Sequence, residues 1–195
     1  FEAVRYLGFP FSLSETFQQR NTNSSINDAF ITVKAIRDLC AKKDKELVVY
    51  LSMGFGNPYG DPYSPQTVVD WSGRMADEGI KILSVADTVG LATAPEVFDV
   101  MKEVIPAHPG IVIGVHLHSA PHNRAEKLDA ALKAGCTRFD SAIKGIGGCP
   151  MAGDALVGNM DTEFMISHFR DKGLDMNIDD VALSEASMMA AGVFI

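Results

Sequence analysis

The sequence has little cysteine and no long apolar run. Its three cysteines, Cys40, Cys136 and Cys149, are too few and too scattered for a disulfide framework or a cysteine-rich zinc site, which favours a reducing compartment. No apolar stretch approaches the roughly 18 residues of a membrane span, and the sequence shows no signal or transit peptide. We therefore expect a protein of the bacterial cytoplasm or the mitochondrial matrix, with no membrane partner.

Positive charge is also scarce. Lys and Arg number 17 against 25 Asp and Glu, which gives a formal net charge of −8. Because no basic stripe can neutralise phosphates, we expect no nucleic-acid partner. An acidic surface repels anions at long range, so an anionic substrate must be held by a metal ion or by local donors.

The sequence also lacks a Gly-x-Gly-x-x-Gly turn and a P-loop, which argues against a nucleotide-binding sheet. What it has is an ordinary globular balance, with 47% apolar and 22% charged residues in 195 positions. No linker or low-complexity stretch divides the chain. We therefore expect residues 1–195 to belong to a single domain.

Strand and helix patterns alternate along the chain. Short runs rich in Val or Ile predict strands at residues 3–9, 46–53, 80–86, 111–117 and 138–143. Between them, apolar residues at intervals of three or four predict helices, with start signals at Ser24 or Ser25, at Ser64-Pro65 and at the capping box from Thr93 to Glu96. This alternation is typical of βα units with a parallel sheet, whose ligands bind at the carboxyl ends of the strands. An open sheet and a barrel both obey this rule.

A His-x-His pair ends the fourth predicted strand. The side chains of His116 and His118 point to the same face of a strand, so both imidazoles could reach one metal ion. The alternative is two polar residues at the mouth of a barrel. Two imidazoles leave coordination positions open, and the amide oxygen of Asn159 is a candidate third ligand that suits a hard cation.

A glycine-rich loop follows the fifth predicted strand and presents one thiol. Residues 145–150 read Gly-Ile-Gly-Gly-Cys-Pro, so the backbone around Cys149 is flexible and Pro150 restrains the chain beside it. A turn with a buried small residue is the alternative. Cys40 and Cys136 stand at packing positions and are expected to be structural.

Two carboxylates are weaker candidates. Asp87 follows a predicted strand, where it can orient other groups or cap the turn at Gly90. Glu163 lies four residues after Asn159, where it can support a ligand or favour a helix N-terminus.

Taken together, His116-Leu117-His118, the 139–150 segment and the 158–163 segment resemble the 3-hydroxy-3-methylglutaryl-CoA (HMG-CoA) lyase family, within the metal-dependent barrel lyases and aldolases that carry a His-x-His pair. Earlier stretches agree over nearly the whole chain, including residues 14–17, 57–61 and 86–90. The Gly-Gly-Cys-Pro loop is the specific part of the resemblance. The His-x-His pair is shared with related aldolases and acyl-CoA condensing enzymes.

The resemblance implies a TIM (β/α)8 barrel and a divalent ion, Mg²⁺ or Mn²⁺, bound by His116, His118 and Asn159. It implies that Cys149 lies in a loop that closes over the substrate, and that Cys149 or His116 assists proton transfer. The reaction implied is a retro-Claisen cleavage of HMG-CoA to acetyl-CoA and acetoacetate. Asp87 and Glu163 are then expected to support the ligands or orient the substrate.

The start of the chain departs from this family. The Arg-Asp pair of the family's first strands is absent, so the chain is expected to cover about the last five βα units of the barrel. Two alternatives remain: another acyl-CoA or 2-oxo-acid aldolase or synthase on the same barrel, and a non-catalytic barrel that binds CoA thioesters. The apolar residues 188–194 can cover the barrel or pack in a homodimer.

Overall fold

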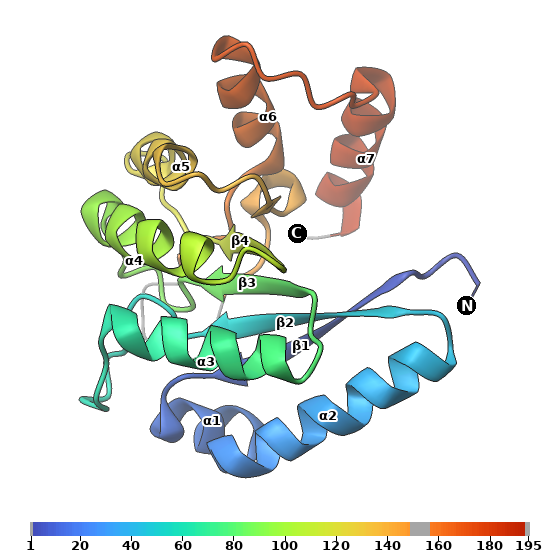
Figure 1. Cartoon of the computed structure of the whole chain (residues 1–195). Coiled ribbons are helices and arrows are strands. Elements are labelled where there is room, and N and C mark those ends of the chain that lie inside the picture. Colours follow the sequence, from blue (N-terminus) through green and yellow to red (C-terminus); the bar gives the residue numbers. More distant parts are fainter. Residues whose placement is uncertain (1, 149–156, 194–195) are drawn as a thin grey trace.

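Five parallel strands form one sheet whose strand order follows the sequence (Figure 1). The structure, a computed structural model, describes residues 2–148 and 157–193. The strands are β1 (Tyr6–Ser12), β2 (Glu46–Ser52), β3 (Ile82–Ala86), β4 (Val112–His116) and β5 (Phe139–Asp140). Every neighbouring pair is parallel, so all five carboxyl ends lie at one edge of the sheet. This is the geometry that the βα alternation predicted.

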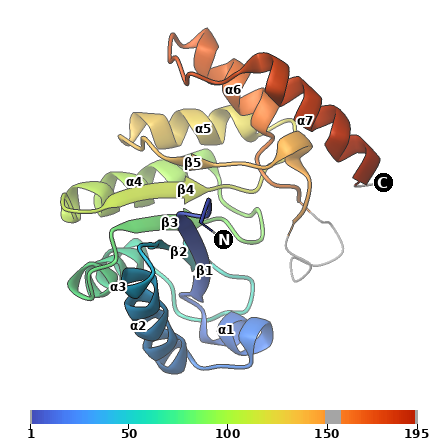
Figure 2. The same ribbon diagram turned by 90° about the vertical axis from the view of Figure 1, so that its right-hand side faces the viewer.

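Helices connect the strands. They are α1 (Glu15–Thr22), α2 (Ile26–Lys42), α3 (Pro65–Asp77), α4 (Ala94–Ala107), α5 (Arg124–Lys133), α6 (Thr162–Asp171) and α7 (Asp180–Val193), with a short 3₁₀ turn, η1 (Ile143–Gly145). Figure 2 shows α2 to α5 along one side of the sheet, with α6 and α7 beyond β5. A doubly wound sheet carries helices on both faces, whereas a barrel carries them only outside. The arrangement is therefore that of a barrel wall.

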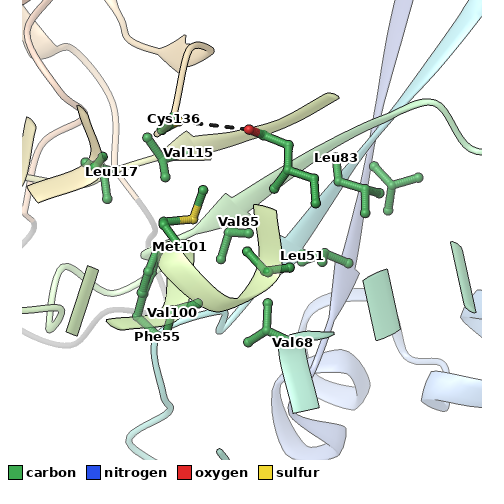
Figure 3. Packing of buried hydrophobic residues seen from close by; sticks show 14 of the residues in the cluster. Leu51, Phe55, Val68, Leu83, Val85, Val100, Met101, Val115, Leu117 and Cys136 are labelled. Carbon is green, nitrogen blue, oxygen red and sulfur yellow. Dashed lines mark hydrogen bonds between the residues drawn. The ribbon is translucent and has the colours of Figure 1, made fainter. Parts of the chain in front are cut away.

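The core fills the space between the sheet and these helices (Figure 3). Leu83 and Val85 of β3 are fully buried, as are Met101 of α4 and Met75 of α3. The intervening strand residues face the other way, around a hollow of about 440 Å³. Its lining includes Tyr50, Ile82 and Arg138. Alternate strand residues thus separate a packed outer face from an inner face that lines the hollow.

The predicted helix starts are confirmed. The side chains of Ser25, Ser64 and Thr93 each accept a hydrogen bond from a backbone N–H in the first turn of the helix that follows. Thr93 and Glu96 form a reciprocal capping box. These contacts satisfy amide groups that have no partner inside the helix, so short-range sequence signals sufficed to locate them.

Two strand predictions missed an end by three residues, whereas the other three came within two residues of the observed bounds. The first strand was predicted at residues 3–9, but β1 runs from Tyr6 to Ser12 because it pairs residue by residue with β2 as far as Ser52. The last was predicted at residues 138–143, but β5 ends at Asp140 and the chain turns into η1, where Lys144 has a positive φ of 58°. The mostly polar helix α1 was not predicted.

Candidate functional site

The predicted histidine pair lies at the carboxyl end of β4. His116 is the last residue of β4, and the ring centroids of His116 and His118 are 5.4 Å apart. His118 is 5% exposed, so its ring is almost fully removed from solvent. The structure therefore places both imidazoles side by side at the strand end, as their alternate positions predicted.

The ring of His118 is oriented by a hydrogen bond to the main chain. Its Nδ1 lies 3.0 Å from the carbonyl oxygen of Val157, so Nδ1 carries the proton and donates. Nε2 is then the unprotonated nitrogen. A metal-binding histidine commonly donates its other N–H to a carbonyl in this way, because the bond fixes both tautomer and orientation.

The side chain of His116 is 28% exposed, but one of its ring nitrogens is buried. Its Nδ1 is shielded from solvent and has no hydrogen-bond partner in the described part of the chain. The nearest carboxylate is Asp140, whose Oδ2 is 3.9 Å from Nδ1. Burial lowers the pKa of His116, His118 lowers it further, and Asp140 opposes both. The lowered pKa favours the neutral imidazole, which is the form that binds metals.

Asn159 is brought to His118 from 41 positions away in sequence by the segment before α6. Residues 158–160 run antiparallel to 117–119, with Ser119 N–H donating to Gly158 O and Met160 N–H to Leu117 O. The amide nitrogen of Asn159 donates to Ile146 O at 2.8 Å, so the amide oxygen faces away from that contact. A Cβ on Gly147, which has φ +94°, would come 2.9 Å from this amide nitrogen. The glycine loop thus leaves room for Asn159.

Three predicted residues remain, and the structure describes two of them. Asp87 is buried just beyond β3, with Oδ1 accepting from Ala92 N–H. Glu163 accepts from Lys144 N–H at 2.8 Å, beside the loop that contacts Asn159. Cys149 lies outside the described residues, and its role stays a prediction.

The two cysteines expected to be structural are confirmed as buried residues. Cys40 and Cys136 are 3% and 2% exposed. Burial raises the pKa of the Cys136 thiol to about 11. Figure 3 shows Cys136 within the apolar cluster. A thiol held protonated in such surroundings is a poor nucleophile at neutral pH.

Sequence reasoning missed the polar side chains that support this site. Asp140 accepts a hydrogen bond from Ser84 Oγ at 2.5 Å. It also forms an ion pair with Arg138, whose Nη2 is 2.8 Å from Asp140 Oδ1. Lys127 of α5 forms a buried ion pair with Asp87 at 2.7 Å. A polar residue inside an otherwise apolar strand, such as Ser84, was the available signal for the contacts around Asp140. The apolar periodicity of residues 124–133 gave no comparable signal that Lys127 would be buried.

Asp61 ties together the loops after β1 and β2. Its carboxylate accepts from Ser14 Oγ at 2.5 Å, Thr16 N–H at 2.9 Å and Thr16 Oγ1 at 2.8 Å. The hydrogen bond from Ser14 is the largest cause that lowers the pKa of Asp61, followed by the one from Thr16 N–H. The carboxylate thus anchors α1 at its N-terminal turn, at the same edge of the sheet as His116.

We expect Asp61→Asn to lower the free energy of unfolding by about 1 kcal/mol at pH 7, because charge-assisted bonds at a partly exposed site are lost. The folded-state pKa lies below the unfolded value, so this stabilisation is present above the unfolded pKa and disappears as pH falls through the folded one. Urea unfolding of both proteins at pH 7 and near pH 2 measures the difference. A gap of equal size at both pH values would contradict the assignment.

The donor set fits a divalent cation. His118 offers Nε2, His116 has a buried ring nitrogen with no partner among residues 2–148 and 157–193, and Asn159 offers an amide oxygen. In the part of the chain that the structure describes, no three His, Cys, Asp or Glu side chains gather as a metal-binding group. A site here therefore depends on the Asn159 amide as well as on the two imidazoles.

Comparison with known proteins agrees with this geometry. The family model described as HMGL-like matches residues 4–189. The chain belongs to the HMGL-like family. A curated relative, the cytoplasmic 3-hydroxy-3-methylglutaryl-CoA lyase of Mus musculus, is 30% identical over 173 residues. The match covers 89% of this chain and 50% of that protein, so the HMGL-like chain spans about half the length of this relative.

Solved structures of the family share the fold. The HMG-CoA lyase of Bacillus subtilis superposes with a TM-score of 0.89 at 26% identity, covering 97% of this chain and 63% of that one. An Acinetobacter baumannii HMG-CoA lyase in complex with coenzyme A and 3-methylmalate gives 0.83 at 26% identity, covering 96% and 61%. The HMGL-like chain is thus part of a TIM barrel, and the predicted fold class is confirmed.

Proposed function

We propose that this chain is part of a divalent-metal-dependent carbon–carbon lyase that cleaves HMG-CoA to acetyl-CoA and acetoacetate. One observation carries the proposal: the fold sets Asn159 beside His118, next to the buried, unpartnered ring nitrogen of His116. The HMGL-like family match and the printed names of the relatives support the substrate.

His116, His118 and Asn159 would hold the ion, Mg²⁺ or Mn²⁺. When bound, such an ion polarises substrate oxygens and stabilises the negative charge that develops on them. The Val157 carbonyl fixes the ring of His118, and the Ile146 carbonyl fixes the amide of Asn159. All three donors are neutral, so the site keeps the positive charge that an anionic substrate requires in an acidic protein.

The cleavage needs a base and an acid. A base removes the proton of the C3 hydroxyl, the C3 carbonyl forms, and the C2–C3 bond breaks with its electron pair passing to the thioester enolate. Protonation of that enolate at C2 gives acetyl-CoA. We assign these proton transfers to His116 and Cys149. Asp87 and Glu163 orient the groups around them.

The CoA part of the substrate needs local cationic donors. The relative from A. baumannii was solved with coenzyme A. A hollow of about 430 Å³ borders Asn159, and Arg124 and Lys144 contribute to its lining. We propose that the acyl-CoA approaches Asn159 through this hollow, because its lining places two cationic side chains beside a proposed metal ligand.

The five strands are proposed to be the last five of the eight in the barrel, within one domain. We place the protein in the bacterial cytoplasm or the mitochondrial matrix, because the HMG-CoA lyases that it resembles include one from Bacillus subtilis and a mitochondrial one from Homo sapiens. Separately, no helix among residues 2–148 and 157–193 combines the length and apolarity needed to cross a membrane. We also propose a homodimer that packs through α7. The support is that Met188 and Met189 of this helix are 66% and 72% exposed.

The proposal is tested by acetoacetate release from HMG-CoA by the full-length protein, with added Mg²⁺ and after chelation. We expect turnover that stops on chelation and returns with Mg²⁺ or Mn²⁺. Cys149→Ala is expected to slow turnover by about 10²-fold or more while metal binding is unchanged. No turnover by a folded, metal-loaded protein would overturn the substrate and favour a sister aldolase or synthase.

A further inference from the structure

Lys127 is buried more deeply than any other ion-paired cation in the described part of the chain. Its side chain is 1% exposed, and that of its partner Asp87 is 2% exposed. It belongs to α5, in the helical layer outside the sheet, yet its ammonium group reaches the carboxyl ends of β3 and β4. Burying an ammonium group is costly unless all its donors are satisfied, so this placement requires an explanation.

The ammonium group has three acceptors at the site. Its Nζ lies 2.7 Å from Asp87 Oδ2, 2.8 Å from His118 O and 3.4 Å from Gly90 O. One acceptor is therefore the main-chain carbonyl of a predicted metal ligand. The bond satisfies one of the three N–H donors of this buried group, and it also ties the main chain of His118 to α5.

The ion pair contacts the main chain of both histidines. The N–H of Asp87 donates to His116 O at 2.9 Å, while Lys127 donates to His118 O. The strand β4 ends at His116, so His118 lies beyond the ladder bonds that hold β4. Lys127 thus supplies, from a neighbouring helix, a hydrogen bond to the first ligand outside the strand.

We propose that Lys127 is a positioning residue that sets the main chain of His118, and through it the imidazole, for binding the divalent ion. This inference rests on the proposed function, because it assumes that His118 is a ligand. Lys127 touches neither the ion nor the substrate. Its effect is on metal affinity through the backbone of His118, with Asp87 as the counter-charge that allows it to be buried.

The test is Mn²⁺ affinity, measured by calorimetry on the full-length protein, beside thermal unfolding. Lys127→Met leaves Asp87 buried without a counter-charge and is expected to lower both stability and affinity. The deciding variant is Asp87→Asn with Lys127→Met, which removes both charges. We expect it to fold with a melting temperature near that of the wild type and to bind Mn²⁺ about 10-fold more weakly or worse.

Controls separate the outcomes. Lys133→Met changes an exposed lysine on the same helix and is expected to leave Mn²⁺ affinity unchanged. Lys127→Arg keeps the charge and donors, so it is expected to fold and to recover part of the affinity. Wild-type Mn²⁺ affinity in either folded Lys127→Met protein would overturn the inference. If neither folds, wild-type stability with unchanged affinity in a Lys127→Gln protein would also overturn it. A wild type that binds no Mn²⁺ would overturn the proposed function together with this inference.

Discussion

His118→Ala is expected to lower kcat for HMG-CoA cleavage by at least about 10³-fold, because several kcal/mol of charge stabilisation by a bound ion corresponds to that factor. The structure gives this residue a nearly buried ring whose Nδ1 donates to Val157 O, which leaves Nε2 available as the proposed ligand atom. Alanine removes that atom. No neighbouring side chain can take its place, since His116 and Asn159 occupy their own positions.

The measurement pairs steady-state kinetics with Mn²⁺ binding. We expect His118→Ala to lose both together, and excess Mn²⁺ not to restore turnover. His122→Ala is the matched control, because His122 lies four residues away and is exposed. A His118→Ala protein that keeps more than about a tenth of wild-type kcat would remove His118 from the metal site.

Asp87→Ala is expected to lower the free energy of unfolding by about 3–5 kcal/mol, because it leaves a buried ammonium group without its counter-charge. Lys127 and Asp87 are both within 2% of full burial, so water cannot replace the lost carboxylate. The substitution also removes the acceptor for Ala92 N–H at the start of the turn before α4.

Urea unfolding at pH 7 measures this change. The matched control is Asp99→Ala, which breaks an exposed ion pair with Lys102 at 2.6 Å and is expected to cost far less stability, because solvent screens the pair. If Asp87→Ala costs no more than the control, Lys127 must find another partner or enter solvent, and the buried pair contributes little to the fold.

Much of the fold was predictable because its signals are short in range. Ser64 and Thr93 bond to amides three residues away, so each helix start is written in a few neighbouring positions. The boundary of β1 was not predictable in this way. The apolar residues before Tyr6 satisfy a strand pattern, but hydrogen bonding to β2 selects the segment that ends at Ser12.

The candidate site divides along the same line. The spacing of His116 and His118 alone places their side chains on one face, because a strand alternates its side chains with a period of two. Asn159 and Cys149 were candidates from their residue types and positions, and the resemblance assigned their roles; of the two, only Asn159 lies within the described residues. The acceptors that orient these side chains, such as Val157 O for His118, depend on loops whose course no local pattern specifies.

The sequence by itself determined the βα order, the helix caps and the paired histidines, because each follows from contacts or periodicities within a few residues. Only the tertiary structure decided that Lys127 meets Asp87 and that Asp140 lies near His116. These partners are 40 and 24 residues apart. The crossovers between parallel strands bring these residues together. Burying an unpaired charge or ring nitrogen costs free energy, so a buried group of this kind is favoured only where a partner lies beside it.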